Sequence, residues 1–411
     1  MSISLWLPQV PDLHEPPEEA DAEGCIQCQM GSKLVLFVTG NCHWRCDYCP
    51  LSETRRDIDN MFANERQCDN FDEVIEEARA MRATGAGITG GDPLMARERT
   101  LEGIRRLKAE FGSSFHLHMY TSIPFRPEGA DEFAEAGLDE IRFHFLDLEA
   151  EQYRQTIAAC SAAGISTGVE LPCEPDKESE LFELLETLRG FEVSFLNLNE
   201  LEITVGNIDN MELRGFNLST EITAGAAGSS ELALALRDRV MAAERGEPDP
   251  LDGELREPYG YHLKFCTSVY KDAGQLRRRF LRRGEATIAP HETLTEDATL
   301  MFGAVYSSEE DQAAWIDEII EQTDLPRRFM LWDAENGRIE LPLVVAGTIA
   351  GAVETALVGQ SATAANIAEA AQEVANIVDP LDDFRGSTQY KTDMAVVFTR
   401  RALESALELN E

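Results

Sequence analysis

Apolar positions in the first half of the chain alternate between two spacings. Short apolar runs such as "KLVLFVTG" at 33–40 have the length and composition of buried strands. Between these runs, apolar side chains recur every three or four residues, as in "FDEVIEEARAMRATG" at 71–85, which is typical of one face of a helix. The predicted strands are 33–40, 87–93, 115–121, 138–146, 165–172 and 193–203. Six strand–helix pairs in succession predict a parallel sheet or a partial barrel.

The pattern divides the chain into four predicted parts. Residues 1–30 form an acidic leader and residues 31–205 the barrel. Residues 206–342 form an extension, with one clear helix at 231–245, a basic helix and a small α+β segment. Residues 343–411 are Ala-rich and mainly helical. Chemistry in an α/β barrel belongs at the carboxyl ends of its strands.

The charge of the chain describes its solvent more than its partners. The formal net charge is -39, and only six of the 36 basic residues are lysines, a balance that resembles the proteins of halophilic archaea. This acidity argues against nucleic-acid binding, which needs a positive surface. No apolar run is long enough to span a membrane, and the first residues show no signal peptide. We therefore expect a soluble cytoplasmic protein.

Three thiols crowd the loop after the first predicted strand. Cys42, Cys46 and Cys49 form C-x3-C-x2-C within "GNCHWRCDYCP". In a reducing setting such spacing indicates a metal site rather than disulfides. Three thiolates can hold three irons of a 4Fe-4S cluster and leave the fourth iron open, whereas structural zinc uses four protein ligands.

The loop resembles the hallmark of the radical S-adenosylmethionine superfamily, C-x3-C-x-Φ-C, in which Φ is the aromatic Tyr48. The phrases "GSKLVLFVTGNCHWRCDYCPLSE", "NELEI" and "KFCTSVYKDAGQLRRR" are most similar to an archaeal group related to pyruvate formate-lyase activating enzymes. The resemblance implies a partial (β/α)6 barrel and an open iron that binds S-adenosylmethionine. Its reductive cleavage gives a 5′-deoxyadenosyl radical that abstracts hydrogen from a substrate, which stays unknown. An electron donor such as ferredoxin or flavodoxin is implied as well.

A Gly-rich turn at the end of the second strand strengthens this resemblance. Gly90, Gly91 and Asp92 in "ITGGDPLM" match the family's G-G-E-P-like turn, whose backbone binds the methionine amino group, with Asp in place of Glu. The resemblance also places Tyr48 near the adenine, and Thr121 is a further candidate ligand contact. Three strand residues could face the barrel interior, although structural hydrogen bonding is the commoner role of such residues. They are Arg142, His144 and Glu170.

The remaining thiols offer a second candidate site. Cys25 and Cys28 form a C-x2-C before the first strand, and Cys266 lies in "YHLKFC". Together they could hold a second iron–sulfur cluster or a zinc ion. The alternative is that Cys25 and Cys28 lie on a mobile leader and Cys266 is a small buried hydrophobe. Cys160 is predicted to belong to the core.

The block "KDAGQLRRRFLRR" at 271–283 is conspicuously basic. It predicts a helix that Gly284 can end. Its guanidinium groups suit an anionic substrate or cofactor, or they pair with acids of the same chain. We prefer internal pairing.

The tail from about 345 resembles the C-terminal domain of the FAD-binding medium subunit of carbon monoxide dehydrogenase. Glu354 to Gly359 and Arg385 to Ser387 carry this resemblance. The flavin-binding part of that subunit is not visible, so we do not predict FAD. The rival to an enzyme is a non-enzymatic iron–sulfur or zinc-binding redox protein fused to an interaction module.

Overall fold

The computed structural model describes residues 20–220, 223–349, 363–376 and 388–406. The chain divides into two compact units. The first ends at Thr287 and also includes residues 296–298, and the second comprises residues 288–295 and 299–411. We describe each unit by itself.

A nine-stranded sheet forms the first unit, in the order β3-β2-β1-β4-β5-β6-β7-β8-β9. Strand β1 and strands β4 to β9 are parallel, and β2 and β3 are antiparallel at the edge beside β1. The strands are β1 (Lys33–Phe37), β2 (Met61–Ala63), β3 (Arg66–Cys68), β4 (Gly85–Thr89), β5 (His116–Thr121), β6 (Glu140–Phe143), β7 (Ser166–Cys173), β8 (Phe195–Glu200) and β9 (His262–Cys266). The six predicted strands are present, and β9 adds a seventh parallel strand within "YHLKFC".

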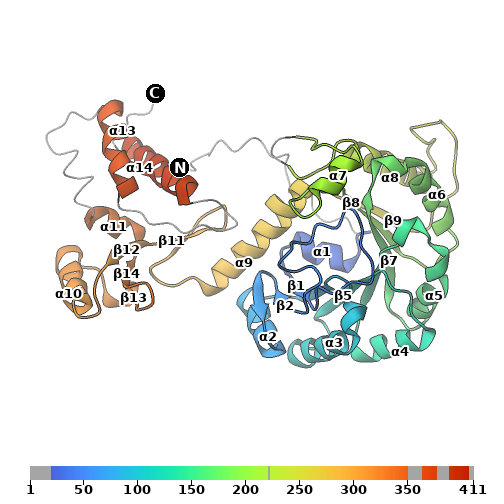
Figure 1. The fold of residues 1–411 in the computed structure, drawn as a ribbon, viewed down its shortest axis with the longest axis horizontal. Helices are drawn as coiled ribbons and strands as arrows, with labels where there is room; N and C mark the ends of the chain where they lie inside the picture. The colour runs from blue at the N-terminus through green and yellow to red at the C-terminus, as the bar shows by residue number, and fades with distance from the viewer. Residues whose placement is uncertain (1–19, 221–222, 350–362, 377–387, 407–411) are drawn as a thin grey trace. The chain divides into compact units, whose positions relative to one another are not determined.

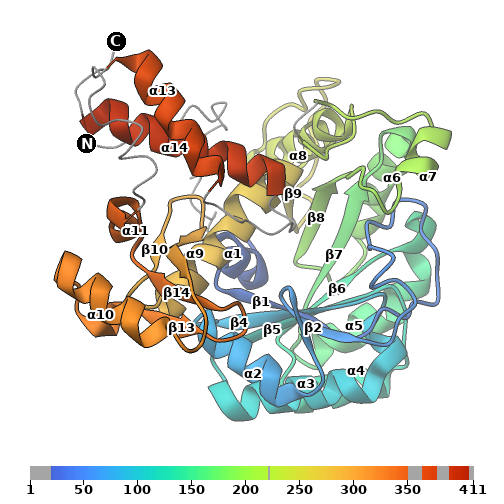
Figure 2. The same ribbon diagram turned by 60° about the vertical axis from the view of Figure 1, so that its left-hand side comes forward.

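Helices alternate with these strands, as the apolar spacing predicted. They are α2 (Phe71–Ala80), α3 (Arg97–Phe111), α4 (Pro127–Ala136), α5 (Arg154–Ala162), α6 (Glu178–Leu188), α7 (Ile208–Leu213), α8 (Ser229–Arg245) and α9 (Arg277–Thr287). Short helical turns are η1 (Pro93–Ala96), η2 (Leu146–Leu148), η3 (Glu151–Tyr153), η4 (Pro175–Lys177) and the π-helical η5 (Tyr270–Leu276). The sheet curves around α1 (Glu23–Gln29), with α2 to α6 on its outer side (Figures 1 and 2).

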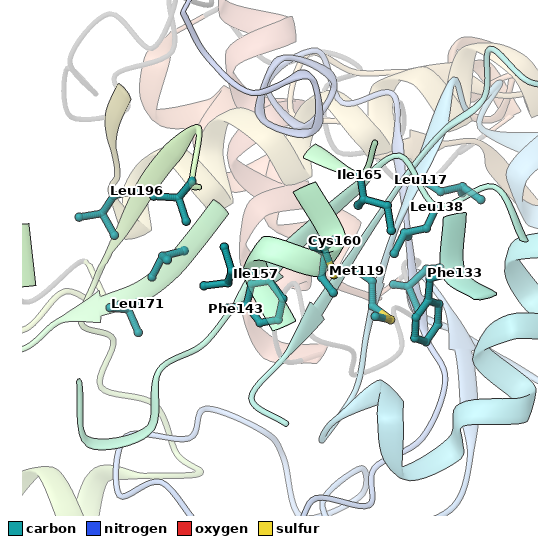
Figure 3. Close-up of a cluster of buried hydrophobic side chains, with 14 of the residues drawn as sticks. Leu117, Met119, Phe133, Leu138, Phe143, Ile157, Cys160, Ile165, Leu171 and Leu196 are labelled. Atoms are coloured by element: carbon teal, nitrogen blue, oxygen red, sulfur yellow. The ribbon is translucent and has the colours of Figure 1, made fainter. Parts of the chain in front are cut away.

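The main hydrophobic core lies between the sheet and its outer helices. Leu117 and Met119 of β5 pack there with Phe133 of α4 and Cys160 of α5 (Figure 3). Cys160 is fully buried, which confirms its predicted core position. Because side chains alternate along a strand, the intervening residues of β5 face the inside of the barrel.

Helix α1 closes the amino-terminal end of the barrel, so residues 23–29 of the predicted leader are folded. The N–H of Gly24 donates to a Glu140 carboxylate oxygen at 3.1 Å, and Lys33 donates to the Gln27 side chain at 3.4 Å. A side chain at Gly24 would come within 2.7 Å of Arg142, His118 and Glu140 atoms. Close packing of this helix therefore depends on glycine.

The basic block forms α9, and its arginines pair within the first unit. Arg279 lies 2.8 Å from Glu65, and Arg283 lies 2.9 Å from Glu77. The other three donate to backbone carbonyl oxygens: Arg277 to Glu296, Arg278 to Gln29 and Arg282 to Arg82. The preferred interpretation, pairing with acids of the same chain, is confirmed for Arg279 and Arg283. The predicted stop at Gly284 is wrong, because the helix continues to Thr287.

The second unit has its own small core. A three-stranded antiparallel sheet has the order β12-β14-β13, and β10 pairs with β11. Its elements are β10 (Thr293–Leu294), β11 (Leu300–Met301), β12 (Gly303–Tyr306), α10 (Gln312–Thr323), η6 (Arg327–Phe329), β13 (Leu331–Asp333), β14 (Arg338–Leu341), α11 (Leu343–Ile349), α13 (Ala364–Gln372), η7 (Glu373–Asn376) and α14 (Thr388–Ala406). Val345 and Ala346 of α11 pack on Ile339 and its neighbours, so the start of the tail belongs to this core. Residues 354–359 and 385–387, which carried the resemblance, lie outside the described residues.

We predict that the first unit works without the second. A chain ending at Ala298 keeps every described residue of the first unit, and it should stay soluble and bind as much iron per molecule as the full chain. Size-exclusion chromatography and iron analysis check this. A chain ending at Arg245 is the control: it loses β9, exposes the edge of β8 and should aggregate. Aggregation of the Ala298 variant would contradict independent units.

Candidate functional site

The thiol loop and the Gly-rich turn are neighbours because β1 and β4 are paired and parallel. Both strands therefore end at the same edge of the sheet. Beyond them, the N–H of Gly91 donates to the Thr39 carbonyl at 2.8 Å, and the N–H of Asp92 donates to the Asn41 carbonyl at 2.9 Å. These two bonds hold the Gly-rich turn against the residue that precedes Cys42.

The backbone of residues 39–41 lies so close to the turn that Gly90 and Gly91 have no room for a side chain. A Cβ atom at Gly90 would lie 2.4 Å from the Thr39 carbonyl oxygen, and one at Gly91 would lie 2.3 Å from that of Asn41. The N–H groups of Gly91 and Asp92 are already used within the chain. A ligand with an ammonium group would therefore meet carbonyl oxygens at this turn, which accept hydrogen bonds from a cation.

Asp92 has a structural role in the described chain. Its side chain is 1% exposed and accepts hydrogen bonds from the N–H of Leu94 at 2.9 Å and the Thr121 hydroxyl at 3.0 Å. It also accepts from the N–H of Ser122 at 2.7 Å and from its hydroxyl at 2.8 Å. The carboxylate thus ties the turn to the end of β5, and Thr121 is directed at Asp92. Sequence reasoning missed Ser122.

The loop thiols line a cavity of about 500 Å³ together with the Gly-rich turn. Cys42, Cys46 and Cys49 are all partly exposed. Burial raises the pKa of Cys46 to about 11 and also raises the pKa of Cys42. These two thiols are therefore protonated at neutral pH, and metal binding would release their protons. Across residues 20–220, 223–349, 363–376 and 388–406, no three His, Cys, Asp or Glu side chains converge as a metal site.

Tyr48 reaches across the cavity to His144 of the β6 end. Its hydroxyl lies 2.7 Å from His144 Nε2, and His144 Nδ1 lies 3.2 Å from the Glu170 carbonyl oxygen. Because that oxygen only accepts, Nδ1 donates to it and Nε2 accepts from Tyr48. Burial lowers the pKa of His144, which favours this neutral tautomer. The hydrogen bond to His144 fixes the ring of Tyr48, which lies between Cys46 and Cys49 in the sequence.

Side chains from outside the loop hold its backbone. Asn207 donates to the Tyr48 carbonyl at 2.9 Å and to the Glu202 carbonyl at 2.8 Å, which joins the loop to the segment after β8. Arg56 donates to the Cys49 carbonyl at 2.9 Å and to the Gly206 carbonyl at 3.1 Å. Sequence reasoning missed both residues, because neither belongs to a recognisable motif.

A buried ion network in the barrel includes Glu170 and Asn199, which also line the cavity. Arg142 is 2.6 Å from carboxylate oxygens of both Glu140 and Glu170, and Asn199 donates to Glu170 at 2.9 Å. Each carboxylate is paired, as burial of charge requires. Arg142 and Glu170 therefore act as structural partners in the described chain.

Comparisons with known proteins agree with this arrangement. Residues 36–163 match the profile of the radical SAM superfamily, and residues 346–406 match the CO dehydrogenase flavoprotein C-terminal domain. A putative glycyl-radical enzyme activating enzyme from Methanocaldococcus jannaschii is 37% identical over 316 residues, which are 74% of this chain and 78% of the relative. The GTP 3′,8-cyclase of Lactiplantibacillus plantarum is 30% identical over 126 residues, which are 29% of this chain and 35% of that protein.

The chain belongs to the radical SAM superfamily. It is thus an enzyme of this superfamily, and the non-enzymatic alternative is set aside. The family implies a 4Fe-4S cluster and S-adenosylmethionine. In the described part of this radical SAM enzyme, no helix is long and apolar enough to cross a membrane.

The other candidate thiols lie inside the radical SAM barrel. Cys25 Sγ is 3.3 Å from a terminal nitrogen of Arg142, and Cys266 Sγ is 3.6 Å from the side-chain oxygen of Asn197. Cys28 lines the cavity from α1. Burial raises the pKa of all three thiols, to about 11 for Cys266. The alternative interpretation is wrong for the leader, since both of its cysteines lie on a packed helix.

Proposed function

We propose that Cys42, Cys46 and Cys49 ligate a 4Fe-4S cluster and that the cavity beside them binds S-adenosylmethionine. The donor set supports this proposal: three thiols at C-x3-C-x2-C spacing face one cavity and leave one iron open. When bound, the cluster would supply the electron that cleaves the sulfonium bond of S-adenosylmethionine and gives a 5′-deoxyadenosyl radical.

The residues around the thiols would orient S-adenosylmethionine. The carbonyl oxygens of Gly90 and Gly91 would accept from the methionine ammonium, because both residues line the cavity and the N–H groups of Gly91 and Asp92 are used internally. Tyr48, held by His144, would lie beside the adenine. Asp92 and Thr121 would act through the shape of the turn rather than by touching the ligand.

The relative's name suggests the substrate class. The Methanocaldococcus jannaschii protein is named as a putative activating enzyme of a glycyl-radical enzyme. By analogy, the radical of the present chain would abstract hydrogen from a partner, with ferredoxin or flavodoxin as the electron donor. A cytoplasmic location fits such a donor and belongs to the same proposal.

The central prediction concerns cleavage of S-adenosylmethionine. After anaerobic reconstitution and reduction, the protein should produce 5′-deoxyadenosine and methionine, measured by liquid chromatography and mass spectrometry. Cys46→Ala should lose the cluster and at least 90% of this activity, because one of three ligands is missing. Cys68→Ala is the matched control, since Cys68 is buried in β3 and does not line the cavity. Wild-type iron content in Cys46→Ala would contradict the ligand assignment.

A second proposal is that Cys25, Cys28 and Cys266 hold a zinc ion or another iron–sulfur cluster. Metal–sulfur bonds of about 2.3 Å would require the three thiols to move together. The triple variant Cys42→Ala, Cys46→Ala, Cys49→Ala should then retain iron or zinc, measured by elemental analysis. If the triple variant is folded but contains neither iron nor zinc, the second site is refuted.

A further inference from the structure

The helix that follows β9 opens with an unusual turn on the cavity wall. Residues 270–276 are π-helical and lead directly into α9. A π-turn widens a helix by one residue, and such turns are frequent at functional sites. Here the widened turn carries Lys271, which lines the same cavity as the three loop thiols.

The end of β8 holds this turn in place. A Glu200 carboxylate oxygen accepts from the N–H and the hydroxyl of Ser268, both at 2.7 Å. The N–H of Tyr270 donates to the Thr267 hydroxyl at 3.1 Å. These bonds satisfy donors at the start of the helix and anchor it two residues from Glu202.

Lys271 and Glu202 meet across this junction at 2.7 Å. Burial alone would lower the pKa of Lys271, but the Glu202 carboxylate outweighs it, so the pKa lies above its ordinary value. The ammonium is therefore charged. An ammonium has three donors, and among the described residues Glu202 accepts from the ammonium of Lys271.

Other cations of the cavity direct their donors at their own chain. Lys33 donates to the Gln27 side chain and the His116 carbonyl, and Arg56 donates to backbone carbonyls. Arg45 pairs with Asp57 at 3.0 Å on the exposed side of the loop. The arginines of α9 do not line the cavity, and they make internal contacts. Lys271 contributes a charged ammonium to this cavity wall from the widened helical turn.

We propose that Lys271 binds an anionic oxygen group of the substrate, either a carboxylate or a phosphate. Glu202 keeps the ammonium charged and directed at the cavity. This inference rests on the proposed function, and it makes Lys271 a specificity-determining residue for an acidic substrate.

The first arm of the test separates the substrate from S-adenosylmethionine, which also carries a carboxylate. Lys271→Met keeps an unbranched side chain, shorter by the terminal nitrogen, and removes its charge. When the hydrogen-donor substrate is absent, this variant should cleave S-adenosylmethionine with a kcat and a KM for S-adenosylmethionine within twofold of the wild-type values. A tenfold rise in KM would overturn the proposal, because Lys271 would then bind S-adenosylmethionine itself. If wild type produces no 5′-deoxyadenosine, the proposed function fails and the second arm still decides.

The second arm measures anion binding on the reconstituted full chain. Potassium phosphate or potassium malonate replaces potassium chloride at constant ionic strength, and the unfolding temperature is recorded. A ligand of the folded state raises this temperature with its concentration. The general salt effect should appear in all variants, and the additional rise should be lost in Lys271→Met. Lys177→Met is the control, since Lys177 pairs with Glu174 and does not line the cavity.

The two anions distinguish the substrate classes. A Lys271-dependent rise with malonate alone assigns a carboxylate, and a rise with phosphate alone assigns a phosphate. Equal rises in wild type, Lys271→Met and Lys177→Met for both anions would overturn the proposal and leave the Lys271–Glu202 pair as a structural contact. Lys271→Arg should retain the rise, because the charge is kept.

Discussion

The parallel pairing of β1 with β4 is the constraint on which the site depends. It ends both strands at one edge, and the bonds from Gly91 and Asp92 to Thr39 and Asn41 then fix the Gly-rich turn beneath the thiol loop. Each such bond contributes only about 1 kcal/mol. Their effect is geometric, because they leave carbonyl oxygens and three thiols on one cavity wall.

The rest of the first unit supports that wall from two sides. Helix α1 closes the other end of the barrel through Gly24 and Gln27, and the segment after β8 holds the thiol loop through Asn207. The segment after β8 also meets the segment after β9, in the Lys271–Glu202 pair. The proposed cluster site and the proposed anion site thus share one cavity.

The strands and helices were predictable from the sequence because their apolar side chains recur at regular spacing. The hydrogen-bond partners that lie far apart along the chain were not predictable. The strands and the helices of the barrel follow from local apolar spacing, and Cys160 was correctly placed in the core. Strand β9 was missed because Lys264 interrupts its apolar pattern, although Leu263 and Cys266 are buried. The Asp92 carboxylate accepts from Thr121 and Ser122, which lie 29 and 30 positions away, and no local pattern contains such partners.

Electron paramagnetic resonance of the reduced, reconstituted protein tests the central claim most directly. An open iron held by Cys42, Cys46 and Cys49 requires the spectrum to change when S-adenosylmethionine is added, and ¹⁷O in its carboxylate should broaden the signal through direct coordination. A spectrum that S-adenosylmethionine leaves unchanged, with the cluster at full occupancy, would contradict a site built for radical SAM chemistry.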